Sequence, residues 1–483
     1  MTASSTEETS TLEEHLELLR NTLEAEQEVT MLCDDYVRGE QNDPYSPDEY
    51  TEEYRELVAR AKTNIIRIPP IVVAQVSAVA GYRRVEDYDD NGEPKSVPFP
   101  QEWKDLKRQR LGVTEKPIYN AACTYGQAFV EVYQDTFGRP RFRLLSSVNT
   151  TAIYEHAAAD EFPVAAYELI QHPTDDLQGL AYGWDEEAKY DLRTNKKGEW
   201  EIFDAIPHNL GSAPIVRFPC FLDSEGRASG LVEHLIPGQD RVNQSALDLL
   251  TGQAYTGSQV YTASGVKGEP VFDEAGQAVI DENTGEQAVR PLQVSSRRVL
   301  TSDDPGAKFG TLGAGDLRSL IESLGNALEI FAITAQMSPY IFHQGSFDNI
   351  SADALAAIDA QFLRLTGMLH DQWAESWCSV LRLFSRINNE EGGAEAYDSE
   401  LRWADKTIKP FASYADGISK IADLGIPKRG LWQMVPGTTA SILQQWDELK
   451  GEDDAYGIDP DDPAGYEREI RQSTTSREVS VGE

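Results

Sequence analysis

Residues 315–351 read GDLRSLIESLGNALEIFAITAQMSPYIFHQGSFDNIS, a helical pattern followed by an aromatic loop. Apolar residues recur at spacings of three and four from Asp316 to about Gln336, which predicts a helix with one long apolar face. Asp316 can cap the first turn with its carboxylate, and Pro339 ends the helix because it disfavours the helical conformation at Ser338. Both ends of this helix are therefore marked in the sequence.

A second, longer helix is predicted after the loop. Ser351 can cap it, and its apolar stripe continues for about 38 residues, roughly 57 Å at the helical rise per residue. The stripe comprises Leu355, Ile358, Phe362, Leu365, Leu369, Trp373, Trp377, Val380, Phe384 and Ile387. A helix of this length is long for a globular protein.

The loop, residues 338–350, allows two interpretations. Its aromatic side chains are Tyr340, Phe342 and Phe347. At least one of them could pack back between the flanking helices. Alternatively, the loop is a mobile hairpin that carries polar and aromatic groups toward a ligand or channel, with Gly345 and Ser346 allowing it to move. Sequence position alone leaves both interpretations open.

The length and the charge of the chain limit the number of domains and the kinds of partner that we expect. The chain has 483 residues, and at about 150 residues per domain this predicts two to four structural units. Lys and Arg total 43 against 81 Asp and Glu, a formal net charge of −38. This balance argues against a sequence-reading nucleic-acid domain with a basic face, but it suits a protein that must avoid adhering to DNA.

The cysteines and the apolar runs give no sign of an exported or membrane protein. Cys33, Cys123, Cys220 and Cys378 show no CxxC or His-Cys spacing, so we expect reduced core thiols in a cytosolic setting. The N-terminus is polar and acidic, unlike a signal peptide. The most apolar run, Ile65–Ala80, is too short to span a bilayer and is expected to be a buried segment.

Periodicity divides the chain before residue 230 into a helical start and a strand-rich part. Helices are predicted at Leu12–Arg38, Glu49–Ala61 and, after the Pro69-Pro70 break, Ile71–Tyr82. From Ala128 the period changes to two, which predicts a hairpin around Asp135–Gly138. Further strands are expected at Ala165–Gln171, Ala188–Leu192, Trp200–Ala205 and Pro214–Phe218, with a turn at Lys196–Gly198. This part reads as an α+β unit.

The rest of the chain returns mainly to helices. Leu231 to about Gln253 is predicted to be helical, with a kink or restart at Pro237. Residues 259–310 break that pattern and read as a small strand-rich insertion between two helices, with strands at Val271–Ile280 and Gln287–Arg290. Later elements are a strand near Leu401–Ile408, three short helices at Tyr414–Leu424, Lys428–Met434 and Thr438–Leu449, and an acidic tail at 451–483. The predicted fold class is α+β, mainly helical.

Catalytic and metal-binding motifs were sought without success. The chain has no GxxxxGK[ST], HExxH or GxSxG, and its histidines show no ligand pair at helical spacing. Residues Asp87–Gly92 match the start of a calcium-binding EF-hand loop, but the twelfth position, which should be Glu, is Pro98. A metal-dependent hydrolase using Asp87, Asp89 and Asp90 is therefore a weaker alternative, and no catalytic residue, metal or cofactor is predicted.

Several short stretches, in this order, carry a resemblance to a known family. They are Tyr36–Glu40, Tyr125–Val130, His208–Val216, Leu235–Asp240 with Asn243, Ala307–Gly310, and the run Thr334–Leu355 with Ser338-Pro339 and Ile350–Leu355. Together they resemble the portal proteins of tailed double-stranded DNA bacteriophages of the siphophage type, over roughly residues 30–450. The resemblance implies a non-enzymatic ring, usually dodecameric, at one capsid vertex, with a central channel for DNA packaging and ejection. Another capsid morphogenesis or scaffold protein is the alternative.

The resemblance also implies a division into parts. These are a wing (1–228), stem helices (229–258 and 311–337), a clip (259–310), a tunnel loop (338–350), a long wing and channel helix (351–388), a wing return strand (389–412), a crown (413–450) and a tail (451–483). The channel residues of the tunnel loop would be Tyr340, Phe342, His343, Gln344, Ser346, Phe347 and Asn349. The clip bases are Lys267, Arg290, Arg297, Arg298 and Lys308, which would serve either in subunit salt bridges or in docking.

The implied partners follow from the same resemblance. They are other copies of the chain, duplex DNA passing without sequence specificity, the terminase large subunit, the head-tail adaptor, the major capsid protein and a scaffold, with no membrane. The expected location is the virion, and the host cytoplasm during assembly. A ring of such acidic chains would repel phosphates, so DNA would slide through it instead of being held.

Overall fold

The computed structural model of the chain describes residues 11–45, 52–88, 94–97, 99–174, 177–257, 317–342 and 352–404. It also describes short pieces at 261–264, 269–270, 277, 289–290 and 308–311, and scattered residues between 418 and 449. The chain forms two compact units. The first comprises Met1–Val37, Ile66–His234 and Leu355–Glu483, and the second comprises Arg38–Ile65 and Leu235–Ala354.

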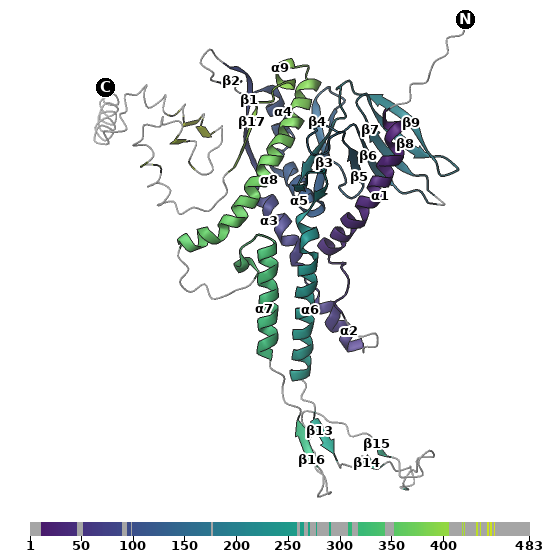
Figure 1. The fold of residues 1–483 in the computed structure, drawn as a ribbon, viewed down its shortest axis with the longest axis vertical. Helices are drawn as coiled ribbons and strands as arrows, with labels where there is room; N and C mark the ends of the chain where they lie inside the picture. The colour runs from purple at the N-terminus through teal and green to yellow at the C-terminus, as the bar shows by residue number, and fades with distance from the viewer. Residues whose placement is uncertain are drawn as a thin grey trace, which may run out of the picture. The chain divides into compact units, whose positions relative to one another are not determined.

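One part of the first unit is a five-stranded antiparallel sheet with one long helix packed on its face (Figure 1). The strands, in spatial order, are β5 (Thr150–Ile153), β6 (Ala165–Gln171), β7 (Leu180–Trp184), β8 (Ala188–Thr194) and β9 (Trp200–Pro207). Helix α1 (Thr11–Arg38) packs Leu12, Leu19 and Leu23 onto one face of this sheet. Gly183 has no side chain to obstruct Leu12, so the helix can approach β7 closely.

A second sheet and three helices enclose the largest core of the same unit. Strands β3 (Gln127–Gln134) and β4 (Pro140–Leu144) form the predicted hairpin, and β10 (Ile215–Pro219) pairs with β3. Helices α4 (Gln101–Arg108) and α5 (Leu111–Tyr125) lie in the same core as α8 (Ala352–Ile387). The Trp377 indole donates to the Tyr119 hydroxyl at 2.8 Å, and the Trp373 indole donates to the Pro219 carbonyl oxygen at 2.8 Å. Among the described side chains of α8, which begin at residue 360, most of the buried ones lie from Trp373 onward.

A third sheet joins segments about three hundred residues apart in sequence. Strand β1 (Val79–Tyr88) lies between β2 (Pro94–Val97) and β17 (Glu400–Trp403), both antiparallel to it. Short elements complete this unit: η1 (Ile65–Arg67, which crosses the unit boundary), β11 (Phe221–Leu222), β12 (Ala228–Ser229) and α9 (Glu391–Ala394). The strand predicted at Leu401–Ile408 is therefore present as far as Trp403, and residues 405–408 lie outside the described part of the chain.

The predicted helix Ile71–Tyr82 is wrong in its second half. Helix α3 spans Ile68–Val76 and accepts both prolines in its first turn, where their missing N–H groups cost nothing. It ends because the Ser77 amide and hydroxyl both donate to the Val73 carbonyl oxygen. The chain then turns into β1, and the Val79 amide donates to the buried Glu115 carboxylate at 3.0 Å.

The second unit is mainly helical. It contains α2 (Glu52–Ala61), most of α6 (Leu231–Gly257), α7 (Leu317–Thr334) and the short 3₁₀ helix η2 (Pro339–Ile341). Helix α6 runs through Pro237 as one element, so the restart considered there does not occur. Residues 38–65, which the sequence-based division placed with the N-terminal part, belong to this unit.

The insertion between α6 and α7 contains strands, as expected. Strand β13 (Tyr261–Ser264) pairs with β16 (Lys308–Thr311), and β14 (Glu269–Pro270) pairs with β15 (Val289–Arg290). The strand expected at Val271–Ile280 lies outside the described residues, as do nearly all residues of the three predicted helices between 414 and 449. Within the described residues, no helix is long and apolar enough to cross a membrane.

Candidate functional site

The sequence-predicted helix pair is the centre of the candidate site. Helices α6 and α7 lie side by side in the second unit (Figure 1), and two glycines of α6 mark where they touch. A Cβ added to Gly238 would lie 3.2 Å from the Phe331 ring, and one added to Gly252 would lie 2.7 Å from the Leu320 Cδ1. The later glycine of α6 contacts the earlier residue of α7, so the two helices are antiparallel. The glycines therefore allow close packing along the pair.

Side chains from the segment before residue 66 hold the opposite side of α6. Asn243 Oδ1 accepts from the Thr63 amide and hydroxyl, both at 2.9 Å, and from Gln239 Nε2 at 2.8 Å. Gln239 also donates to the Thr63 carbonyl oxygen at 3.0 Å. Both Gln239 and Asn243 are buried, so these bonds replace water contacts that the two side chains lose. Nearby, Val58 and Ala61 of α2 pack with Leu247.

The start of the predicted tunnel loop is anchored to α7. Gln336 adopts a left-handed conformation with φ of 54°, which ends the helix, and Ser338 is buried. Pro339–Ile341 form η2, and the Phe342 ring lies edge-on against Phe331 with centroids 5.3 Å apart. One of the three loop aromatics therefore packs back onto a flanking helix.

The other predicted loop residues are not placed. The backbone of Tyr340 lies in η2, but its side chain is outside the description. His343, Gln344, Ser346, Phe347 and Asn349 also lie outside the described residues. Their assignment to a channel stays a prediction.

The clip bases are placed only in part. Arg290 lies opposite Glu269 in the β14–β15 pair, and Lys308 lies opposite Ser264 in the β13–β16 pair. The side chains of these residues are outside the description, as are Lys267, Arg297 and Arg298 altogether. The choice between subunit salt bridges and docking contacts therefore stays open.

In the first unit, a buried ion cluster fixes the C-terminal end of α8. Arg84 Nη1 on β1 donates to Glu102 of α4 at 3.0 Å and to Glu390, just after α8, at 2.8 Å. Glu102 is fully buried, and burial raises the pKa of its carboxyl group while the Arg84 charge opposes that rise. Arg382 of α8 makes a second buried pair with Glu161 at 2.7 Å. This end of the long helix is thus rigidly held.

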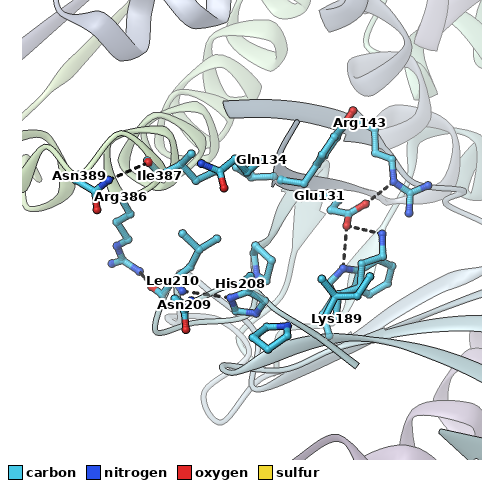
Figure 2. A pocket seen from close by; sticks show the side chains of 16 residues that line it. Glu131, Gln134, Arg143, Lys189, His208, Asn209, Leu210, Arg386, Ile387 and Asn389 are labelled. Atoms are coloured by element: carbon cyan, nitrogen blue, oxygen red, sulfur yellow. Dashed lines mark hydrogen bonds and ion pairs between the residues drawn. The ribbon is translucent and has the colours of Figure 1, made fainter. Parts of the chain in front are cut away.

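The first unit also has a cavity of about 650 Å³ between the β3 hairpin, the loop after β9 and the end of α8 (Figure 2). In Figure 2 the Glu131 carboxylate points toward Lys189 and Arg143, and it accepts from Lys189 Nζ at 2.7 Å and from the Trp184 indole at 3.0 Å. These groups of the cavity wall already satisfy one another. The charged groups around Glu131 are therefore paired within the protein.

His208 in the same cavity wall is neutral. Its Nδ1 accepts from the Leu210 amide at 3.2 Å, so Nε2 carries the proton that is donated to the Asp185 carbonyl oxygen at 3.0 Å. Burial lowers the pKa of the imidazole, which agrees with this tautomer. His208 therefore orders the loop after β9 as a hydrogen-bonding bridge.

The residues considered for metal-dependent chemistry are placed only in part. The structure places Asp87 in the β1–β2 hairpin opposite Lys95, whereas Asp89 and Asp90 lie outside the description. Among the described residues, no group of three or more His, Cys, Asp or Glu could hold a metal ion. All four cysteines are free and buried, as predicted, and burial raises the pKa of Cys33 and of Cys378 to about 12.

Comparison with known proteins identifies the class of this arrangement. A model of the SPP1 Gp6-like phage portal proteins matches residues 35–456, which is most of the chain. The chain belongs to this family of phage portal proteins. The fold class and the family inferred from the sequence are thereby confirmed.

Particular relatives are more distant. The portal protein of Mycobacterium phage L5 is 22% identical over 230 residues, which are 46% of this chain and 45% of that protein. The match therefore spans less than half of this curated relative. Among solved structures, a chain in the virion of a native gene transfer agent particle is 15% identical, with a TM-score of 0.44, covering 81% of this chain and 96% of its own. A chain in the neck of a native gene transfer agent particle computed with C12 symmetry is 13% identical, with a TM-score of 0.41, covering 79% and 91%.

Sequence reasoning missed several of the contacts that shape the site. Gly238 and Gly252 gave a usable signal, because two glycines within a helical pattern often mark a close helix contact. The hydrogen bonds from Thr63 to Asn243 left no signal in the sequence, since the two residues are 180 positions apart. The cavity and the ion cluster around Arg84 likewise depend on pairings that no local pattern records.

Proposed function

We propose that copies of this chain form a closed ring at one capsid vertex and that double-stranded DNA passes through its centre during packaging and ejection. The membership of the portal family carries this proposal. The paired helices α6 and α7, with a strand-bearing insertion at their far end, support it as a stalk with a tip. In this proposal the ring is a conduit, and a separate terminase motor supplies the energy.

The parts of the chain then take the following roles in the proposal. Helices α6 and α7 form the stem, the insertion between them forms the clip that docks the terminase and later the head-tail adaptor, and residues 338–350 form the tunnel loop. Residues 1–228 and the return strand at 389–412 form the wing, which meets the capsid protein, and residues 413–450 form the crown. The buried end of α8 supports its role as the fixed arm that carries the loop.

The charge of the chain supports passage of DNA without retention. The formal net charge is −38. Each firm phosphate contact would release counterions and oppose movement of the duplex, so a conduit functions best with few of them. The excess of carboxylates over basic groups supplies repulsion instead.

Salt dependence of DNA binding tests this role. Binding of the purified ring to a linear duplex is measured between 50 and 200 mM salt by fluorescence anisotropy. The proposal predicts weak binding and a shallow dependence on salt. Tight binding that falls by about a thousandfold over this range would show a protein built to hold phosphates and would overturn the proposal.

A deletion tests the loop separately. Removing residues 344–349 should leave the ring intact, because the described anchor at Phe342 remains, but should impair DNA packaging or retention. Ring assembly is followed by native mass spectrometry and packaging by protection of DNA from nuclease. Normal packaging in the deletion variant would exclude this role of the loop.

A further inference from the structure

The side of helix α7 that faces away from α6 exposes two isoleucines next to charged and polar residues. Residues 322, 326, 329, 330 and 333 follow one another at helical spacing and share this outer face. Ile330 is 43% exposed and Ile333 is 56% exposed, although the opposite side of the helix is already buried through Ala327 and Phe331. Ile330 and Ile333 are about one turn apart, so they form one small exposed apolar area beside Glu329. The outer face therefore lacks a partner within the described part of the chain.

Helix α6 has an exposed face of different character. Pro237, Arg241, Gln244 and Asp248 recur at spacings of four and three, and all but Gln244 are exposed. The Arg241 guanidinium forms no hydrogen bond or ion pair with any described residue, and the same holds for the Glu329 carboxylate on α7. One helix thus offers an unpaired cation and the other an unpaired anion.

The helix contacts fix the relative heights of these residues. Gly238 meets Phe331, and Gly252 meets Leu317 and Leu320. Moving one residue forward along α6 therefore corresponds to moving one residue backward along α7. Counted from either glycine, Arg241 is level with the turn that contains Glu329. By the same count, Pro237 is level with Ile333, and Gln244 is level with Asn326.

We propose that adjacent copies of this chain meet in the ring through the outer face of α7 on one copy and the exposed face of α6 on the next, with Glu329 paired to Arg241. The inference rests on the proposed ring. The proposed ring has its axis parallel to α6 and α7. Rotation about such an axis keeps every residue at its height, so residues that meet between copies are level. The three rungs are then an apolar pair, an ion pair and an amide pair. Within its own helix, Gln244 Nε2 also donates to Asp248 Oδ1 at 3.1 Å. Such a head-to-tail contact gives a closed ring when the rotation between successive copies divides a full turn evenly.

A fourth pair of residues at the same height, Asp248 and Glu322, gives this alignment of the two helices a consequence that can be tested. Asp248 is level with Glu322, so the same contact brings two carboxylates together near the end of the stalk. Like charges at this rung oppose association, which makes Glu322 the position where a substitution should strengthen the ring. The acidic border also disfavours DNA as the occupant of the face, because phosphates would be repelled.

Charge reversal tests the pairing. Arg241→Glu and Glu329→Arg should each lower the association constant by about two- to five-fold per contact, compounded around the ring. The double variant should restore assembly, and Glu322→Lys alone should increase the fraction of rings. Glu28→Arg, a reversal at an exposed position on α1, is the matched control and should not change assembly. Native mass spectrometry at fixed protein concentration measures the fraction in rings.

The outcomes separate this inference from the function on which it rests. Rings that form equally well in the wild type and both single variants, or a double variant that fails to recover, would overturn the Arg241–Glu329 contact but leave the ring intact as a proposal. A wild-type chain that forms no ring would overturn the proposed function itself.

Disulfide trapping gives an independent test that does not rely on charge. Arg241→Cys and Glu329→Cys are made in separate chains, mixed as monomers, assembled and oxidised. We expect disulfide-linked dimers only in the mixture. Asp248→Cys mixed with Glu329→Cys should give none, because Asp248 lies seven residues, about 10 Å, along α6 from Arg241. Absence of dimers in the first mixture, or equal yields in both, would contradict the contact.

Discussion

Phe342 lies edge-on against Phe331, with ring planes at 79° and centroids 5.3 Å apart. Phe331 in turn packs on Gly238, so one buried ring connects the helix pair with the first turn of the loop that follows α7. The loop therefore leaves the helix pair from a fixed point, which determines where its remaining residues can reach.

Phe342→Ala should loosen the attachment of residues 338–342 to α7. The substitution removes an aromatic pair worth about 0.5–1.5 kcal/mol, so amide exchange in residues 338–342 should accelerate while the rest of α7 stays protected. Hydrogen exchange followed by mass spectrometry measures this. Ile341→Ala is the matched control, because the Ile341 side chain is 51% exposed. Equal exchange in the two variants would show that the pair does not anchor the loop.

Gly252→Val should destabilise the second unit. Its Cβ would lie 2.7 Å from the Leu320 Cδ1 and 3.1 Å from the Leu317 Cδ2, and overpacking of this kind costs about 1–3 kcal/mol. Thermal unfolding should show a lower Tm. Gly112→Ala on α5, where an added Cβ meets nothing within 4 Å, should be neutral or stabilising. An unchanged Tm for Gly252→Val would indicate that α6 and α7 are not closely packed at this point.

Asn243→Leu should weaken attachment of residues 38–65 to α6. The change leaves the part-buried Thr63 amide without its acceptor and removes one of the acceptors of Gln239, at a cost of about 1–3 kcal/mol. Urea unfolding monitored by fluorescence measures the loss. Gln253→Ala, at an exposed position of the same helix, should change little. If both variants unfold at the same urea concentration, the network contributes no net stability.

His370 should make the first unit less stable in mild acid. It stacks on Trp403 with centroids 4.2 Å apart, and burial lowers the pKa of its imidazole to about 4. Because the unfolded chain protonates first, stability from this group is complete above its ordinary pKa of 6.5 and falls as pH drops from there toward 4. His370→Gln should reduce the loss of Tm between pH 7 and pH 5.

A histidine elsewhere serves as the control for that measurement. His172→Gln, at an exposed position after β6, should retain the wild-type pH dependence. If His370→Gln retains it as well, protonation of His370 is not coupled to unfolding.

Much of the helical framework was predictable because its periodicity is local. The stripes of α7 and α8 run through uninterrupted helical spacing, and their observed bounds agree with the predicted ones within about two residues. Strand β6 was predicted with its observed bounds, because Gln171 is followed by the turn-forming His172-Pro173-Thr174. Signals confined to a few neighbouring residues thus translated directly into structure.

Other elements were not predicted, because their local apolar pattern is weak or because their partners are far away in the sequence. Helix α4 has only Trp103 and Leu106 as buried apolar residues, and α5 contains Pro117, which normally argues against a helix interior. The helix predicted through Tyr82 failed because β1 takes its partner β17 from three hundred residues away. In the candidate site, the aromatic loop was noticed from sequence, but which ring would pack back was not decidable without Phe331 in place.

Imaging the purified protein along its symmetry axis by cryo-electron microscopy tests the central claim most directly. The account predicts a closed ring in which the α6–α7 pair of each copy stands beside that of the next around an open central bore. A strict monomer at micromolar concentration, or an open filament, would contradict it.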